Sequence, residues 1–218
     1  MEKRRRITIW AGLGSLAAFA LWTWAVCRIG VQPIGPNGSR VGFGEMNHWF
    51  HQLTGVHMGL YTVTDWLGLV PVCFVLGFGL LGLVQLIRRR SLRKVDPDIL
   101  LLGGFYILVL GAYLLFEALA VNYRPILIDG YLEASYPSST TLLALCVIPT
   151  GMLQLHARLQ SRMLRRSLLV LLGAFTGFMV IGRLLSGAHW LTDIIGGVLL
   201  SAGLVLLYQG LSGQSLAR

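Results

Sequence analysis

Six long apolar stretches, each with few charged residues, dominate this sequence of 218 residues. A helix needs about 20 predominantly apolar residues to cross the hydrocarbon core of a bilayer, and each stretch is close to or above that length. The stretches lack the alternation of apolar and polar residues that is typical of a membrane β-barrel. We therefore predict an all-α polytopic membrane protein with six transmembrane helices. The predicted spans are residues 7–27, 66–87, 99–121, 139–157, 167–185 and 191–209.

Lysine and arginine are distributed unevenly around these spans. Four lie at the N-terminus, five between spans two and three, four between spans four and five, and one, Arg218, in the C-terminal tail. With six spans, these 14 of the 18 basic residues lie on one side of the membrane. Because cytoplasmic loops carry an excess of Lys and Arg, we expect both termini to be cytoplasmic. This bias accounts for the net charge of +9, which therefore does not indicate a nucleic-acid partner.

The first loop on the opposite side is the longest link, and it covers residues 29–64. Its second part, Met46–Tyr61, interleaves apolar and polar residues, which predicts a helix lying in the membrane interface. This helix contains His48, His51 and His57. Because no cysteine or carboxylate completes a ligand set with them, we interpret them as polar interfacial histidines and predict no metal site. We treat 1–218 as a single membrane domain with a core at about 65–210.

Polar residues gather in three segments on the side away from the basic clusters. In the last of them, His189 and Asp193 are four residues apart, so they share a face if they lie on one helix. The carboxylate can then hold the imidazole by its Nδ1–H and leave Nε2 free as a nucleophile or base. Ionisable groups at membrane depth are costly and are functional candidates for that reason. The three segments are residues 122–125, 136–141 and 182–193.

Features suited to binding a phosphoryl group lie in the same segments. Pro137 is typical of the first turn of a helix, so the next backbone N–H groups would be free to bind an anion with the help of the helix dipole. These groups belong to Ser138, Ser139 and Thr140. Arg124 and Arg183 add two guanidinium groups that suit phosphate oxygens. The combination predicts phosphoryl transfer through a phosphohistidine.

Together the three segments resemble the type-2 phosphatidic acid phosphatase superfamily. That family has three motifs: Lys, six residues, Arg-Pro; then Pro-Ser-Gly-His; then Ser-Arg, five residues, His, three residues, Asp. The matching residues are Arg124-Pro125 for the first motif, Pro137-Ser138 for the second, and Arg183, His189 and Asp193 for the third. The resemblance implies an enzyme that hydrolyses lipid phosphates at the extracytoplasmic face, with no metal and no other cofactor.

The resemblance also implies roles for the matching residues. His189 would be the nucleophile and Asp193 its orienting partner, while Arg124, Arg183 and Ser138 would bind phosphate. The sequence departs from the motifs at four positions: Glu117 replaces lysine, Ser139 glycine, Thr140 the second histidine, and Gly182 serine.

The change at Thr140 has a consequence for the substrate, because the histidine it replaces is the general acid of the family. A threonine hydroxyl has too high a pKa for this task. A phosphomonoester expels an alkoxide whose conjugate acid has a pKa of about 16, near that of water. A diphosphate instead expels a phosphomonoester with a pKa of about 6, which can leave unprotonated. We therefore predict a preference for a lipid diphosphate, with an undecaprenyl diphosphate-like lipid as the candidate.

Glu117 has two interpretations. It lies seven residues before Arg124, so both can share a face of the third span. Burial could raise the pKa of its carboxyl enough to make it a substitute acid, or it could form an ion pair with Arg124 or Arg183.

Two other classes of function compete with an enzyme. A catalytically weak or inactive relative that binds anionic lipid headgroups would also keep the arginines. A transporter would place its polar residues near the midplane of the membrane, whereas the polar residues here lie at the ends of spans.

Overall fold

The structure is a computed structural model that describes residues 2–214. Within that range, six helical segments are long and apolar enough to cross a membrane, which confirms the prediction of an all-α polytopic membrane protein. Their bounds are Glu2–Arg28 (α1), Met58–Leu67 continuing as Leu69–Arg89 (α3 and α4), Pro97–Leu119 (α5), Ser139–Arg158 (α6), Arg162–Leu185 (α7) and Leu191–Ser212 (α8). Single 3₁₀ turns at Pro36–Gly38 and Leu92–Lys94 lie in the links.

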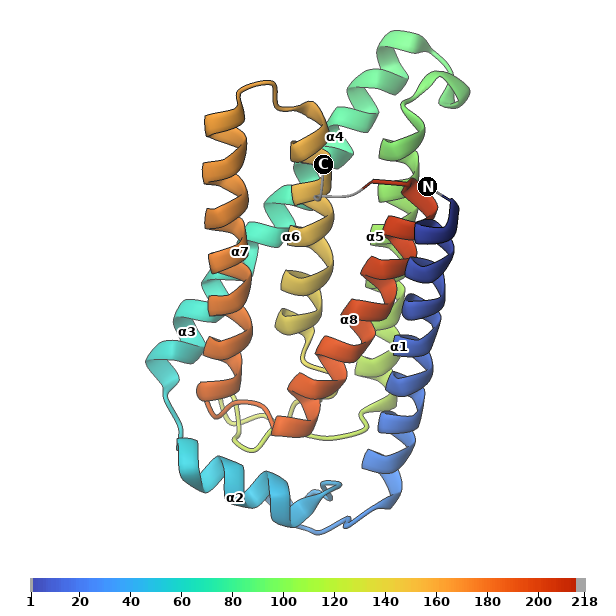
Figure 1. The fold of residues 1–218 in the computed structure, drawn as a ribbon. Coiled ribbons are helices and arrows are strands. Elements are labelled where there is room, and N and C mark those ends of the chain that lie inside the picture. The colour runs from blue at the N-terminus through green and yellow to red at the C-terminus, as the bar shows by residue number, and fades with distance from the viewer. Residues whose placement is uncertain (1, 215–218) are drawn as a thin grey trace.

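A further helix, α2 (Gly44–Thr54), lies across one end of the bundle (Figure 1). The helix predicted over Met46–Tyr61 is therefore correct only in its first half. Gly55 follows α2 with a φ of 70°, a conformation that glycine adopts without steric cost. A new helix begins at Met58 and leads directly into the second span.

The centre of the bundle is formed by α6 and α8, which are the most buried of the spans, whereas α3 and α4 are mostly exposed. α1 packs along α8, and α6 contacts α7, α4 and α5. Close approach of α1 and α8 depends on small residues, as is usual between membrane helices. A Cβ atom on Gly203 would lie only 2.6 Å from the side chain of Leu16.

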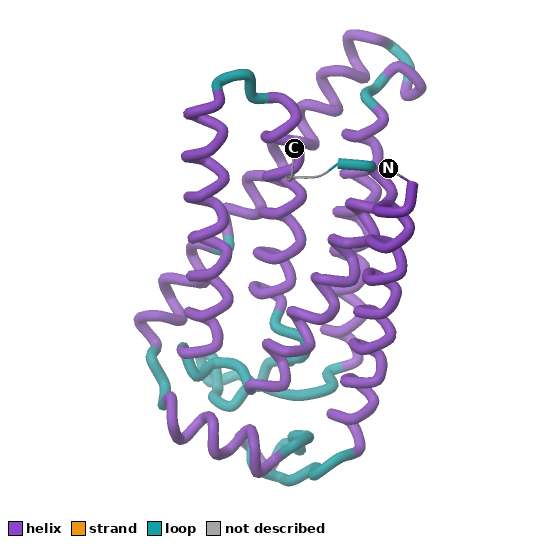
Figure 2. The backbone as a smooth tube through the Cα atoms, in the orientation of Figure 1, coloured by secondary structure: helices purple, strands orange, loops and turns teal. Residues whose placement is uncertain are grey.

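The two ends of the bundle differ in what they contain (Figures 1 and 2). The N-terminus and the basic α4–α5 and α6–α7 links lie together at one end, as the charge count predicted. Arg218, which was counted with them, lies outside the described residues. α2 and the α5–α6 and α7–α8 links lie at the other end, which we call the site end. The three polar segments therefore meet at one end of the bundle.

Candidate active site

Arg124 is held by a hairpin in the α5–α6 link. Asp129 and Gly130 turn the hairpin with φ values of 48° and 83°, as a tight two-residue turn requires. The backbone N–H of Arg124 donates to the carbonyl of Glu133 at 3.0 Å. The Nε atom of the same arginine lies 2.9 Å from Oε2 of Glu133. The hairpin thus fixes the guanidinium group and places a carboxylate beside it.

His189 lies in the link before the first turn of α8, rather than on that helix. Its Nε2 atom is 3.2 Å from Nη1 of Arg124. A guanidinium group can only donate, so Nε2 accepts this hydrogen bond and the ring proton lies on Nδ1. Burial, together with the smaller effect of the charges of Arg124 and Arg183, lowers the pKa of His189 to about 4, although Asp193 opposes the shift. The imidazole is therefore neutral at neutral pH, as a nucleophile must be.

Asp193 lies fully buried in the first turn of α8. Its Oδ2 accepts a hydrogen bond from the backbone N–H of Trp190 at 2.9 Å, and its Oδ1 accepts one from Asn122 at 3.0 Å. Oδ2 also faces Nδ1 of His189, at 3.8 Å. That distance is too long for a hydrogen bond. The two side chains are neighbours, but the predicted hydrogen bond between them is not formed, because His189 precedes the helix instead of lying on it.

Arg183 lies in the last turn of α7, where 1% of its surface is exposed, and it points toward α3. Nη1 donates to the carbonyl of Tyr61 at 3.3 Å and to Oγ1 of Thr64 at 3.4 Å, and Nη2 lies 3.2 Å from Oδ1 of Asp65. Its guanidinium carbon lies 4.6 Å from the centre of the Tyr61 ring, and that of Arg124 lies 5.8 Å from the same ring. The two arginines therefore converge on one aromatic ring.

The start of α6 differs from the predicted anion site. Ser138 caps the helix, and its backbone N–H donates to the carbonyl of Asp193 at 3.1 Å. This N–H group is therefore not free to bind an anion, contrary to the prediction. Ser139 is half-buried and lines the pocket described next, whereas Thr140 is buried and does not line that pocket.

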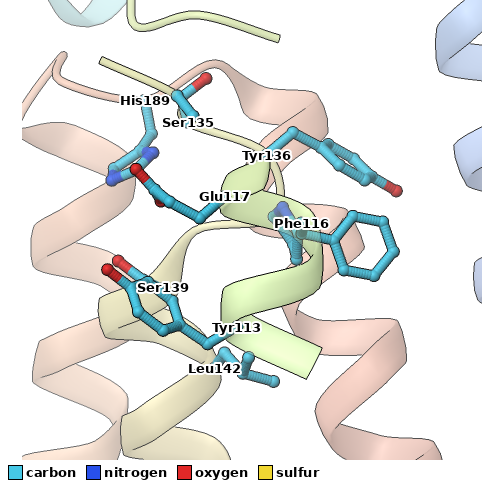
Figure 3. Close-up of a pocket in the computed structure, with 10 residues that line it drawn as sticks. Tyr113, Phe116, Glu117, Ser135, Tyr136, Ser139, Leu142 and His189 are labelled. Carbon is cyan, nitrogen blue, oxygen red and sulfur yellow. The ribbon is translucent and has the colours of Figure 1, made fainter. Parts of the chain in front are cut away.

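A small pocket opens beside His189 (Figure 3). Glu117 lines it, and its carboxylate is directed toward the imidazole. Because Arg124 is paired with Glu133 and Arg183 with Asp65, neither arginine forms the predicted ion pair with Glu117.

A much larger apolar groove, of about 910 Å³, runs along α4, α5 and α6. Leu86 and Val95 line it near the end of the bundle that contains the N-terminus. Tyr113 and Ser139 line it at the site end, and both also line the pocket beside His189. The polar pocket and the apolar groove therefore adjoin at these two residues.

The three histidines of the first loop lie around the α7–α8 link or on the surface. His51 Nε2 is 3.2 Å from the carbonyl of Gly187, His48 contacts Gln52, and the ring of His57 contacts the carbonyl of Thr54. Among residues 2–214, no group of three or more His, Cys, Asp or Glu side chains is placed to hold a metal ion.

Several residues of the site were not found from the sequence. Tyr61, Asp65 and Glu133 contact the two arginines, and Asn47 on α2 donates to Oγ1 of Thr192 at 3.0 Å beside Asp193. Asp65 could have been found from the sequence, because an acid at the start of an apolar span is a candidate functional residue. Glu133 reaches Arg124 across the hairpin, whereas Tyr61 and Asn47 contact the site only through the packing of distant segments.

Comparison with known proteins supports the same family. Comparison with curated proteins gave no match. Among solved structures, the chain is similar to the first transmembrane PAP2 type phosphatidylglycerolphosphate phosphatase from Bacillus subtilis, with a TM-score of 0.59 and 18% identity over 94% of this chain and 96% of that chain. At this identity the likeness shows a shared fold. The sequence profile of the PAP2 superfamily matches residues 73–214, a range that contains the three segments compared with the family motifs above. The chain therefore belongs to the PAP2 superfamily.

Proposed function

We propose that this protein is a membrane phosphatase that hydrolyses lipid phosphates, preferentially a lipid diphosphate such as an undecaprenyl diphosphate-like lipid. The observation that carries the proposal is the junction of the polar pocket and the apolar groove at Tyr113 and Ser139. A phosphorylated headgroup beside His189 would have its hydrocarbon chain along α4 and α5, inside the span region. A soluble phosphate ester would leave this groove unused.

The first step begins at Nε2 of His189, which attacks the terminal phosphorus. The P–O bond to the lipid breaks, and its electron pair leaves with the bridging oxygen. Arg124 transfers its Nη1 hydrogen bond from Nε2 to a phosphoryl oxygen, and Arg183 adds a second positive charge nearby. The phosphorylated ring is positively charged, and its Nδ1–H donates a hydrogen bond to Asp193 once Nδ1 and Oδ2, now 3.8 Å apart, move closer together. Fixed donors of this kind stabilise the charge that develops on the transferring group.

The preference for a diphosphate rests on Thr140. A threonine cannot protonate an alkoxide at neutral pH, but a phosphomonoester with a pKa of about 6 leaves without a proton. The related phosphatase from Bacillus subtilis is described as acting on phosphatidylglycerolphosphate. We propose a different substrate class for this chain because its second motif lacks the histidine.

We also propose that the site end faces the extracytoplasmic side. The support is the concentration of Lys and Arg at the opposite end, which the positive-inside rule assigns to the cytoplasm.

The test is phosphate release by detergent-purified protein from farnesyl diphosphate, phosphatidate and phosphatidylglycerolphosphate, measured side by side. His189→Ala removes the nucleophile, and His57→Ala changes a histidine outside the pocket as a matched control. We expect the fastest turnover with the diphosphate, no turnover in His189→Ala, and normal turnover in His57→Ala. Faster turnover of phosphatidate would overturn the substrate preference, and an active His189→Ala variant would overturn the mechanism.

A catalytically weak relative that binds anionic lipids is the second candidate, and the threonine at position 140 favours it. Thr140→His discriminates between the two. A large gain in turnover of every substrate would mark a protein that has lost its acid. Little change with the diphosphate would mark an enzyme that does not need one.

A further inference from the structure

The proposed reaction leaves one step without an assigned group. The phosphohistidine must be hydrolysed, and the attacking water has to lose a proton. Asp193 faces the other ring nitrogen, and Thr140 is buried away from the pocket. Among residues 2–214, the carboxylate that lines the pocket with His189 is that of Glu117.

Glu117 has the surroundings of a reactive group rather than of a structural ion pair. Both arginines of the site are already paired, Arg124 with Glu133 at 2.9 Å and Arg183 with Asp65 at 3.2 Å. Glu117 itself is exposed at the pocket, near the end of α5, and points toward the imidazole (Figure 3). An ionisable residue within a membrane span is a candidate for a functional role.

The position of Glu117 on α5 matches the geometry of the second step. Tyr113 lies one turn earlier on the same helix face and marks the junction with the groove, through which the lipid leaving group would depart. In phosphoryl transfer the attacking and leaving oxygens lie roughly in line. Water must therefore approach the phosphohistidine from the side that the lipid phosphate has vacated, which is the side that Tyr113 and Glu117 border.

We infer that Glu117 is the general base that hydrolyses the phosphohistidine intermediate. Water attacks the phosphorus while its proton passes to the Glu117 carboxylate, the P–N bond breaks, and its electron pair returns to Nε2 of His189. Inorganic phosphate leaves, and Glu117 releases the proton to solvent. The inference rests on the proposed function and adds a reason for the glutamate at this position: with a diphosphate, the first step needs no acid, and the second step needs a base.

The experiment separates the two steps with farnesyl diphosphate carrying ³²P in its terminal phosphate. Rapid mixing with purified enzyme measures release of farnesyl monophosphate and of inorganic phosphate, and an alkaline quench preserves phosphohistidine for counting. In Glu117→Gln we expect a normal burst of about one farnesyl monophosphate per enzyme, accumulation of labelled protein, and phosphate release slowed by about 100-fold, the scale of general base catalysis. Glu117→Asp keeps the carboxylate and is expected to recover part of the rate. Glu45→Gln, which removes an exposed acid on α2, is the matched control and should behave as the wild type.

Three results would overturn the inference alone: wild-type phosphate release in Glu117→Gln, loss of its burst together with its phosphate release, or failure of Glu117→Asp to exceed Glu117→Gln. The second result would assign Glu117 to the first step. Failure of the proposed function looks different, because wild-type protein would then form no labelled intermediate that depends on His189. In that case both proposals fall together.

Discussion

Arg124 donates a hydrogen bond from Nη1 to Nε2 of His189 across 3.2 Å while its Nε pairs with Glu133 at 2.9 Å. One guanidinium group thus contacts both the proposed nucleophile and a carboxylate of the opposite hairpin strand. In this arrangement the hydrogen bond occupies the lone pair of the proposed nucleophile. In the proposed reaction, Arg124 therefore has to turn from His189 to a phosphoryl oxygen before the imidazole can attack.

Arg124→Lys is expected to lower kcat/KM for a lipid diphosphate by roughly 100-fold, the usual effect of removing one preorganised donor. Lysine keeps the positive charge but has a single ammonium group, which cannot reach His189 and Glu133 in a planar fork. Steady-state phosphate release measures the effect. Arg40→Lys, at an exposed arginine of the first loop, is the matched control. Equal kcat/KM in Arg124→Lys and wild type would show that only the charge matters.

Glu133→Gln is expected to strengthen binding of phosphate-like anions. The Glu133 carboxylate competes with a phosphoryl group for Arg124, and its removal also reduces the negative charge at the site end. Because the side chain of Glu133 is 41% exposed, the effect is modest, about threefold in the inhibition constant of vanadate. Competitive inhibition assays at low salt measure it, with Glu45→Gln as the control. A larger inhibition constant in Glu133→Gln, meaning weaker binding of vanadate, would show instead that Glu133 holds Arg124 in its productive position.

Protonation of His189 is expected at unusually low pH. Burial disfavours the charged imidazolium, so the pKa falls from its ordinary value of 6.5 to about 4. The neutral, nucleophilic form therefore persists at all pH values above about 5, and activity that depends on it is lost only as the pH falls through about 4. Titration of ¹⁵N-histidine-labelled protein in detergent, with His189→Ala used to assign the signal, gives the midpoint directly. A midpoint near 6.5 would contradict the described burial.

Gly187→Ala is expected to destabilise the site more than Gly130→Ala. Both glycines have positive φ values, 70° and 83°, which cost an alanine roughly 1–2 kcal/mol. Only at Gly187 would the new Cβ also collide with the backbone, at 2.2 Å from the carbonyl oxygen of Gly55, whereas nothing lies within 4 Å at Gly130. Thermal unfolding in detergent and phosphate release measure the two effects. Equal losses in both variants would show that the α2–α3 turn moves aside without cost.

Much of the fold could be predicted from local features of the sequence. The length of the apolar stretches predicts the spans, and the clusters of Lys and Arg predict which links lie at the same end of the bundle. Both predictions depend on short segments and on the bilayer rather than on packing. The spacing of Arg183, His189 and Asp193 likewise lies within one short segment. The prediction for Met46–Tyr61 was wrong in its second half because the left-handed backbone at Gly55 ends the helix there.

Tertiary structure alone decided which charges meet. Arg183 on α7 pairs with Asp65 on α3, and Arg124 pairs with Glu133 across the hairpin of the α5–α6 link. Neither arginine forms the ion pair that was one of the two interpretations of Glu117. The apolar groove was equally invisible, because helices in lipid are apolar on all sides and their pattern does not reveal the face that contacts a neighbour. The sequence by itself determined the spans, the common side of the basic segments, and the three polar segments that resemble the family motifs. Packing of the helices determined that His189 accepts a hydrogen bond from Arg124, stays 3.8 Å from Asp193, and shares its pocket with Glu117.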